Sequence, residues 1–172
     1  MMANPVDKII SLSAALSWRQ RLEHDKQTMA VTNGCFDIMH RGHAQYLYEA
    51  AQKADALLVL VNSDASVRAV KGEGRPILPE SDRAYMLASL EAVTAVVVFD
   101  TENCTSQLRS LKPDVYVKGG DYRPETLVQD EYRLLQSMGC RVELIPPVPG
   151  VSTTEIISRI QAPKLGRYQS QY

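Results

Sequence analysis

Paired cysteines, an excess of charge of one sign and long hydrophobic runs are all missing from this 172-residue sequence. Its 3 cysteines are far apart and form no CxxC pair, which argues against a disulfide framework and against a cysteine-based zinc site. Nineteen Lys and Arg against 20 Asp and Glu give a formal net charge of −1, so nothing drives the whole chain toward nucleic acid or an anionic membrane. The longest apolar runs, 56–61 and 95–99, fall well short of the ~20 residues that span a bilayer. We therefore expect a cytoplasmic protein that binds neither nucleic acid nor membranes.

The length and the composition are those of one globular domain. A chain of 172 residues lies within the ~100–200 residues usual for a single domain, and 45% hydrophobic with 23% charged residues is typical of a protein with a packed core. We expect an N-terminal helical segment over residues 1–27 and a single domain over 28–160. Residues 161–172 show no apolar periodicity and are expected to form a flexible tail.

Apolar, β-branched runs of strand length alternate with stretches of helical character along the chain. The runs are Ala30–Thr32, Leu57–Val61, Ala95–Phe99, Val115–Val117 and Val142–Ile145, and the expected helices are Gly42–Lys53, Glu80–Leu90, Thr105–Leu111, Thr126–Met138 and Thr153–Ile160. Near-continuous apolar strands are expected where both faces of a sheet are covered. The pattern predicts an α/β fold, with a doubly wound parallel sheet between two helical layers, and ligands beyond the carboxyl ends of the strands.

Two histidines lie where the first predicted strand leads into a helix. His40 and His43 are three residues apart and are expected on neighbouring positions of one helix face. Gly42 between them removes a side chain where ligand oxygens approach the backbone, and a helix N-terminus favours phosphate. The alternatives are that the two histidines are surface or capping residues, or that they form half of a metal site. Asp37 would be the only obvious further ligand of such a site.

Polar residues also follow the other predicted strands. Asn62 and Asp64 end the second strand and favour sugar hydroxyls. The segment 118–121, Lys-Gly-Gly-Asp, permits a close backbone approach to a nucleotide. Ser152 and Glu155 form a capping pattern, while the two threonines between them place hydroxyls at a helix N-terminus that suits an anion.

Several of these residues have an equally simple structural interpretation. Ser63 fits a turn that caps the next helix. The glycine-rich segment that begins at Lys71 fits a solvated surface loop, and the segment 118–121 fits a plain turn. Arg83, early in a helix where acids are preferred, fits an ion pair with Glu80 or Asp82.

The run Gly34-Cys35-Phe36-Asp37 followed by His40-x-Gly-His43 resembles the signature of the cytidylyltransferase-like nucleotidyltransferases, the HxGH superfamily, which has a Rossmann-like fold. Further segments occur here in the order found in D-glycero-β-D-manno-heptose 1-phosphate adenylyltransferases: Val61-Asn62-Ser63-Asp64, Ser66-Val67-Arg68, Lys71-Gly72, Arg75-Pro76, Lys118-Gly119-Gly120-Asp121-Tyr122 and Ser152-Thr153-Thr154. The resemblance covers about residues 29–160. It implies transfer of AMP from ATP, with Mg²⁺, to the heptose 1-phosphate, giving ADP-heptose and pyrophosphate for lipopolysaccharide core or related glycan precursors.

The resemblance also implies a role for each matching residue. The implied catalytic residues are His40, His43, Lys71 and Arg83. The implied nucleotide-binding residues are Asn33, Gly34, Cys35, Phe36, Gly42, Lys118, Gly119, Asp121, Ser152, Thr153 and Thr154, and the implied substrate-binding residues are Asp37, Asn62, Asp64 and Arg75. Mg²⁺ is expected on the ATP phosphates, with no protein ligand assigned.

The chain departs from the pattern at two places. Asn103-Cys104-Thr105 stands where many members have Thr-Pro, and residues 129–131 are more polar than is usual for that helix. In many bacteria the domain is fused to a ribokinase-like kinase. This sequence does not contain that kinase, so we expect a separate sugar kinase to supply the sugar 1-phosphate. The protein could also be a homo-oligomer. One alternative function is a cytidylyltransferase acting on glycerol 3-phosphate or a phosphoalcohol, disfavoured because residues 147–151 lack the arginine that such relatives carry. The other is a nucleotide-binding module without turnover.

Overall fold

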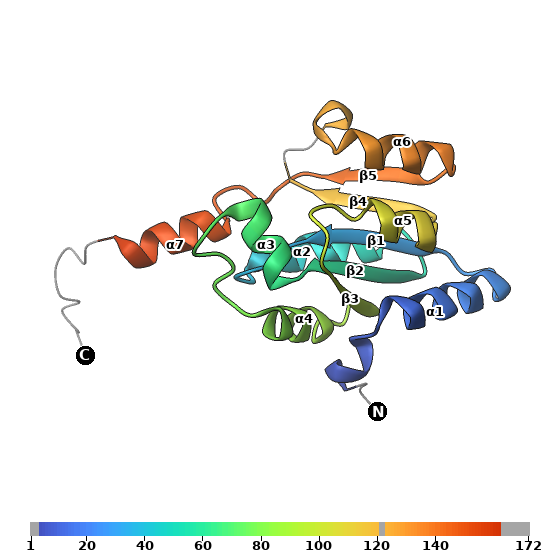
Figure 1. Ribbon diagram of the computed structural model, residues 1–172, viewed down its shortest axis with the longest axis horizontal. Helices are drawn as coiled ribbons and strands as arrows, with labels where there is room; N and C mark the ends of the chain where they lie inside the picture. Colours follow the sequence, from blue (N-terminus) through green and yellow to red (C-terminus); the bar gives the residue numbers. More distant parts are fainter. Residues whose placement is uncertain (1–3, 121–122, 163–172) are drawn as a thin grey trace.

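A single parallel sheet organises the computed structural model, which describes residues 4–120 and 123–162. The strands are β1 (Met29–Gly34), β2 (Ala56–Asn62), β3 (Ala95–Phe99), β4 (Val115–Gly119) and β5 (Arg141–Ile145). Their order in the sheet is β3-β2-β1-β4-β5 (Figure 1). The chain moves outward from β1 to β3 and then returns to the other side of β1, so the strand order reverses between β1 and β4. The predicted doubly wound α/β fold is confirmed, and a reversal of this kind opens a crevice at the carboxyl ends of the strands.

The helices that connect the strands agree with most of the predicted positions. They are α1 (Leu12–His24), α2 (Arg41–Ala51), α3 (Asp64–Lys71), α4 (Glu80–Ala88), α5 (Thr105–Leu111), α6 (Gln129–Ser137) and α7 (Thr153–Gln161), with 3-10 turns η1 (Pro5–Lys8) and η2 (Pro124–Thr126). Within the described ranges, none is both long enough and apolar enough to cross a bilayer. Most of the expected tail, from residue 163 on, lies outside the described residues.

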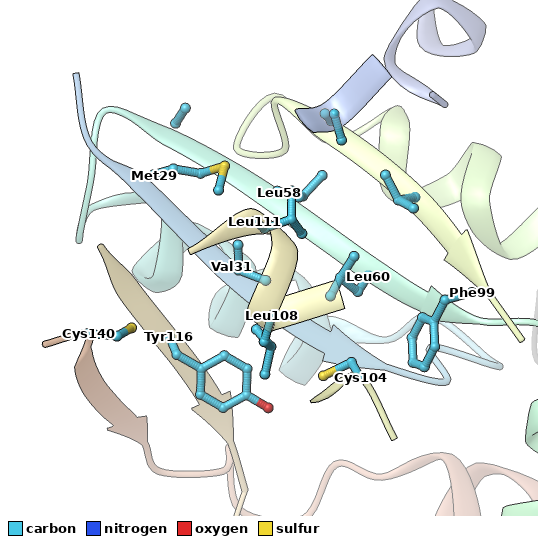
Figure 2. Packing of buried hydrophobic residues seen from close by; sticks show 14 of the residues in the cluster. Met29, Val31, Leu58, Leu60, Phe99, Cys104, Leu108, Leu111, Tyr116 and Cys140 are labelled. Carbon is cyan, nitrogen blue, oxygen red and sulfur yellow. The ribbon is translucent and has the colours of Figure 1, made fainter. Parts of the chain in front are cut away.

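Both faces of the sheet are covered, which explains why β2 is buried along its whole length. Leu58 and Leu60 face the cluster formed with α1, α5 and α6, where Leu108 and Leu111 of α5 lie over the strands (Figure 2). Leu57 and the alternate residues after it face α2 and α4. Each fully buried leucine contributes about 2 kcal/mol of transfer free energy, so the alternation along β2 holds both helical layers on the sheet.

The N-terminal helical segment is part of this core. Ala15 and Leu22 of α1 belong to the same buried cluster as the sheet residues, and the Ile10 N–H donates to the Val96 carbonyl at 2.9 Å. α1 therefore packs on the domain that follows it.

Helix α3 is the one described α-helix that the sequence pattern did not predict. Ser63 begins it, because its hydroxyl accepts a hydrogen bond from the Ser66 N–H, and Gly72 ends it with φ +88°. The helix has only 8 residues and buries only Ser66 and Val67, so the apolar period is too short to recognise. The capping interpretation of Ser63 is confirmed, and Lys71 is the last residue of this helix.

Candidate active site

A cavity of about 510 Å³ lies at the carboxyl end of the sheet. Every strand contributes to it, either by its last residues or by the segment that follows. From the strand ends and the segments after them come Asn33–Asp37, Asn62, Glu102, Asn103, Lys118–Gly120 and Ile145–Val148, and the first turns of α2 and α7 complete the wall. The site therefore lies where the reversal of strand order opens the crevice.

His40 and His43 form a stacked pair at the start of α2. His40 is the N-cap residue, and its Nδ1 accepts from the His43 N–H at 3.4 Å. The two imidazoles lie parallel within 18°, with ring centroids 3.8 Å apart, and the Phe36 ring meets His43 edge-on. Only His43 lies inside the helix, because His40 is the N-cap residue. The two rings therefore contact each other by stacking and do not lie on one face of the helix.

Burial sets the charge of this histidine pair. Burial and the neighbouring His40 lower the pKa of His43 to about 4. Burial also lowers the pKa of His40. Both rings are therefore neutral at neutral pH in the free protein. A neutral imidazole has one N–H, and the hydrogen bond of His43 with the Ile38 backbone competes with the cavity for it.

Glycines at the site make room for rings of the protein itself. A Cβ on Gly42 would lie 3.0 Å from two ring atoms of His40, so this glycine lets the His40 ring fold back over the helix start. A Cβ on Gly119 would lie 2.5 Å from the ring of Tyr46. The Tyr46 hydroxyl bonds to Thr32 and donates to the Val117 carbonyl at 2.9 Å, which ties α2 to the sheet. The space predicted for a ligand beside these glycines is thus partly filled by His40 and Tyr46.

Asp37 anchors the loop between α3 and α4. Its carboxylate, 2% exposed, accepts from the Ile77 N–H at 2.8 Å and the Leu78 N–H at 2.9 Å. It also pairs with Arg75 at 2.8 Å. Asp37 was predicted to contact substrate or a metal, but the loop and Arg75 already occupy its oxygens. Asp37 and Arg75 both line the cavity, so they shape the wall that follows Lys71.

Arg83 and Asp64 pair with each other outside the cavity wall. The Arg83 side chain is fully buried and donates to the Cys35 carbonyl at 2.6 Å, to Asp64 at 2.7 Å and to the Leu78 carbonyl at 3.0 Å. Neither Arg83 nor Asp64 is among the described residues that line the cavity. The predicted direct contacts of these two residues with reactants stay predictions, because the structure pairs them with each other while leaving the Asp64 side chain 28% exposed. Arg83 holds the 35–37 turn and the start of α4 in place.

Asn62 remains at the cavity with a defined orientation. Its side chain is 5% exposed, and its amide donates to the Ser66 hydroxyl at 2.8 Å. Ser66 in turn donates to the Thr101 carbonyl. The amide oxygen of Asn62 faces the Cys35 thiol at 4.0 Å, and burial raises the pKa of that thiol. Cys35 is therefore a neutral thiol at neutral pH.

The first turn of α7 closes the cavity. The Ser152 hydroxyl accepts from the Glu155 N–H at 3.1 Å, which confirms the predicted cap. In a capping box the Glu155 side chain would accept a hydrogen bond from the Ser152 N–H. Here the Glu155 carboxylate pairs with Arg159 instead. Thr153 lies against the Ile38 carbonyl at 3.4 Å. The helix N-terminus and its hydroxyls thus lie beside the turn that leads to the histidines.

The fold brings most of the predicted site residues together. Those that line the cavity are Asn33, Gly34, Cys35, Phe36, Asp37, His40, Gly42, His43, Asn62, Lys71, Arg75, Lys118, Gly119, Ser152, Thr153 and Thr154. Asp121 lies outside the described residues. Further residues that the sequence did not predict also line the cavity, among them Gln45, Tyr46, Glu49, Glu102, Val128 and Glu131. For Glu131 a signal existed, because residues 129–131 are unusually polar.

The described part of the chain holds no cluster of three or more His, Cys, Asp or Glu side chains that would suit a metal ion. The cations around the cavity are Lys71, Arg75 and Lys118, beside the two histidines. Asp37, Glu49, Glu102 and Glu131 line the cavity too, so a nucleotide phosphate would be held locally, beside Lys71, Lys118 and the helix N-termini, and not by the net charge of the wall.

The chain is similar to known proteins over most of its length. A family model described as cytidylyltransferase-like matches residues 31–159. The bifunctional protein HldE of Syntrophotalea carbinolica is 47% identical over 156 residues, which cover 89% of this chain and 31% of that protein. HldE of Helicobacter pylori is 44% identical over 154 residues, covering 90% and 31%. The chain thus spans about a third of the length of the curated relatives it matches.

Solved structures share the fold. A lipopolysaccharide core biosynthesis protein from Thermoplasma volcanium superposes with a TM-score of 0.58 at 24% identity, over 71% of this chain and 97% of that one. A pantoate-beta-alanine ligase from Francisella tularensis gives 0.61 at 13% identity, over 88% and 76%. The family match over most of the chain, together with identities above 40% to curated relatives, shows that this protein belongs to the cytidylyltransferase-like family.

Proposed function

We propose that the protein transfers AMP from ATP to a sugar 1-phosphate, D-glycero-D-manno-heptose 1-phosphate, and releases pyrophosphate. The observation that carries this proposal is the stacked His40–His43 pair at the start of α2, in one cavity with Lys71 and Lys118. A helix N-terminus and cations on several walls suit a triphosphate whose charge redistributes during the reaction. The heptose itself is supported by the ordered set of motifs and by the HldE relatives.

The reaction needs no covalent enzyme intermediate. A phosphate oxygen of the sugar 1-phosphate attacks the α-phosphorus of ATP, and the bond from that phosphorus to the bridging oxygen of pyrophosphate breaks. A phosphate monoester has its second pKa near ~6, so its dianion is a nucleophile at neutral pH without a general base. The neutral Cys35 thiol fits this scheme, because no protein nucleophile is required.

The protein's part is to align the reactants and to stabilise growing negative charge. His40 and His43 offer N–H donors to the phosphates, and the phosphates favour protonation of rings that are neutral in the free protein. Lys71, at the end of α3 and followed by Gly72 and Gly74 with positive φ, approaches from the loop side. Mg²⁺ would be held by the ATP phosphates and water, since the oxygens of Asp37 are already occupied.

Nucleotide and sugar are expected at different parts of the cavity. The segments 118–120 and 146–154 would hold the nucleotide, and the apolar residues Pro147, Val148 and Val151 offer a surface for a base. Asn62, at the end of β2, would contact the sugar. A kinase reaction must supply the sugar 1-phosphate, from a separate protein or from another part of a longer chain. We place the reaction in the cytoplasm, where ATP is available.

A substrate panel tests the proposal. The protein is incubated with ATP or CTP and with heptose 1-phosphates, other sugar 1-phosphates or glycerol 3-phosphate, while pyrophosphate is followed. We expect turnover with ATP and the heptose 1-phosphate. Equal use of CTP with glycerol 3-phosphate would replace the heptose assignment by the cytidylyltransferase alternative. Nucleotide binding without pyrophosphate from any pair would point to a binding module.

A further inference from the structure

Glu131 is a buried carboxylate in the wall of the cavity. It lies in the first turn of α6 and is 4% exposed. Its Oε1 accepts from the Cys104 N–H at 2.8 Å, at the start of α5, a helix that has no side-chain cap of its own. Its Oε2 is 3.5 Å from the Tyr116 hydroxyl. One oxygen thus ties α6 to α5, while the other lies beside the Tyr116 side chain of β4.

Lys118 lies at the other end of the same hydrogen-bonded group. Its Nζ donates to Asn33 Oδ1 at 2.7 Å, and the Tyr116 hydroxyl donates to the same oxygen at 2.8 Å. A lysine only donates, so these contacts orient the Asn33 amide. Figure 2 shows the Tyr116 hydroxyl pointing along β4 toward the start of α5. Side chains from β1, β4 and α6 therefore converge at the cavity.

The charges around Lys118 indicate that Glu131 helps this lysine to keep its proton. Burial lowers the pKa of Lys118, and the positive charge of Lys71 acts in the same direction. The thiols of Cys35 and Cys104 also face Lys118, but burial raises the pKa of both, so they are neutral at neutral pH. Among the described residues whose charges act on Lys118, Glu131 is a carboxylate, and its charge favours the ammonium form.

We propose that Glu131 is a positioning residue that keeps the Lys118 ammonium charged and directed into the cavity, where it binds an anionic group of a substrate. Asn33 and Tyr116 lie between the two charges: the Tyr116 hydroxyl donates its one proton to Asn33 Oδ1, and the same hydroxyl lies 3.5 Å from Glu131 Oε2. The inference rests on the proposed function only for the identity of the anion, a phosphate oxygen.

The variant Glu131→Gln separates this role from capping. Glutamine has the same shape, and its amide oxygen still accepts from the Cys104 N–H, so the capping bond is kept while the charge is lost and the atom beside the Tyr116 hydroxyl becomes an N–H donor. Asp130→Asn is the matched control, because it removes a carboxylate from the same turn of α6. The Asp130 side chain is 84% exposed, so its charge lies in solvent.

The direct test is the titration of Lys118 followed by NMR of lysine labelled with ¹³C at Cε, with the signal assigned by its loss in Lys118→Arg. We expect Glu131→Gln to lower the Lys118 pKa by about one pH unit, a tenfold change in the proton affinity, at an intermediate effective dielectric. Asp130→Asn should leave it unchanged. An unchanged Lys118 pKa in Glu131→Gln would overturn the proposal. This titration needs no turnover, so its outcome is independent of the substrate assignment.

A reciprocal measurement leaves Glu131 in place and serves if Glu131→Gln fails to fold. The ¹³Cδ shift of Glu131 should show an inflection at the pH where Lys118 loses its proton. In Lys118→Arg, which stays charged, the inflection should vanish. Persistence of the inflection in Lys118→Arg would contradict the coupling.

The pH profile of pyrophosphate release gives the functional readout. We expect the basic limb of kcat/KM to move about one pH unit lower in Glu131→Gln than in wild type, since Lys118 loses its charge earlier. In the Lys118→Arg background, Glu131→Gln should leave the limb where it is. An equal shift in both backgrounds would mean that Glu131 acts on another group.

Discussion

The imidazole rings of His40 and His43 lie stacked with their centroids 3.8 Å apart. Two cationic rings at this separation would repel each other, and burial adds a desolvation cost, so the free protein holds the pair neutral. A phosphate in the cavity changes this balance, because it compensates the charge that the pair avoids. The arrangement links the protonation of the histidines to the presence of an anion.

Removal of either histidine should therefore reduce catalysis strongly. We expect His40→Ala or His43→Ala to lower kcat for pyrophosphate release by at least ~10²-fold, the scale for one lost transition-state donor. The stability cost should be about 1 kcal/mol for His40, which caps α2 with a long bond. Turnover is measured beside thermal unfolding of each variant. Near-normal turnover in both variants would refute the assignment.

The histidine pair should also make stability depend on pH. The native pKa of His43 is about 4, below the ordinary value of 6.5, so between these values the unfolded chain binds more protons than the native one. The free energy of unfolding should rise with pH through this window, and at the acid end this residue should lower it by no more than about 3.5 kcal/mol. Urea unfolding at pH 4.5 to 7 measures the slope. His43→Gln should flatten it, whereas His24→Gln, with an exposed side chain, should not.

Lys71 should act on the chemical step. It lines the cavity from the end of α3, and Gly72 and Gly74 after it have positive φ, a conformation that suits glycine. We expect Lys71→Ala to slow single turnover by at least ~10-fold while ATP still binds, because the loss falls on charge that develops in the transition state. Quenched-flow and calorimetric titration with ATP measure the two effects. Arg109→Ala, an exposed cation on α5, is the control. A wild-type single-turnover rate in Lys71→Ala would make Lys71 a surface residue.

Asp37 should act through the loop it anchors. Asp37→Asn keeps the volume but removes the charge that pairs with Arg75 and that two backbone N–H groups share. We expect a stability loss of about 2–4 kcal/mol and faster proteolysis within residues 72–79, because a buried partner is lost. Asp82→Asn, exposed at the start of α4, should change neither. If the loop resists protease as in wild type while the KM for the sugar phosphate rises, Asp37 contacts substrate after all.

Substitutions of Asn62 and Asp64 should have different effects, although the two residues are only two positions apart. Asn62 lines the cavity, so Asn62→Ala should raise the KM for the sugar 1-phosphate well above any effect on the KM for ATP. Asp64 pairs with the buried Arg83, so Asp64→Asn should mainly lower the free energy of unfolding. Steady-state kinetics with each substrate varied in turn, beside urea unfolding, distinguish them. A selective sugar KM effect in Asp64→Asn alone would reverse these roles.

The roles of several charged residues were decided by tertiary structure. Asp37 meets the backbone of Ile77 and Leu78, 40 and 41 positions away, and Glu131 meets Cys104, 27 positions away. Sequence spacing carries no signal for such contacts, because they depend on how crossover connections return to the sheet. The sequence also carries no signal that Asp64 and Arg83 form an ion pair, so each was interpreted as a site residue.

What the sequence determined by itself is local. The strands follow from apolar periodicity, and the Ser152 cap follows from a side chain that bonds to backbone three residues away; neither depends on distant parts of the chain. The position of the histidine motif after β1 was also evident, because strand order along the chain places it at the carboxyl end. The stacking of His40 on His43, the Tyr46 ring against Gly119 and the burial of Glu131 beside Lys118 were decided only by tertiary packing. Burial and distance set these charges and contacts, and both arise only when separate elements pack together.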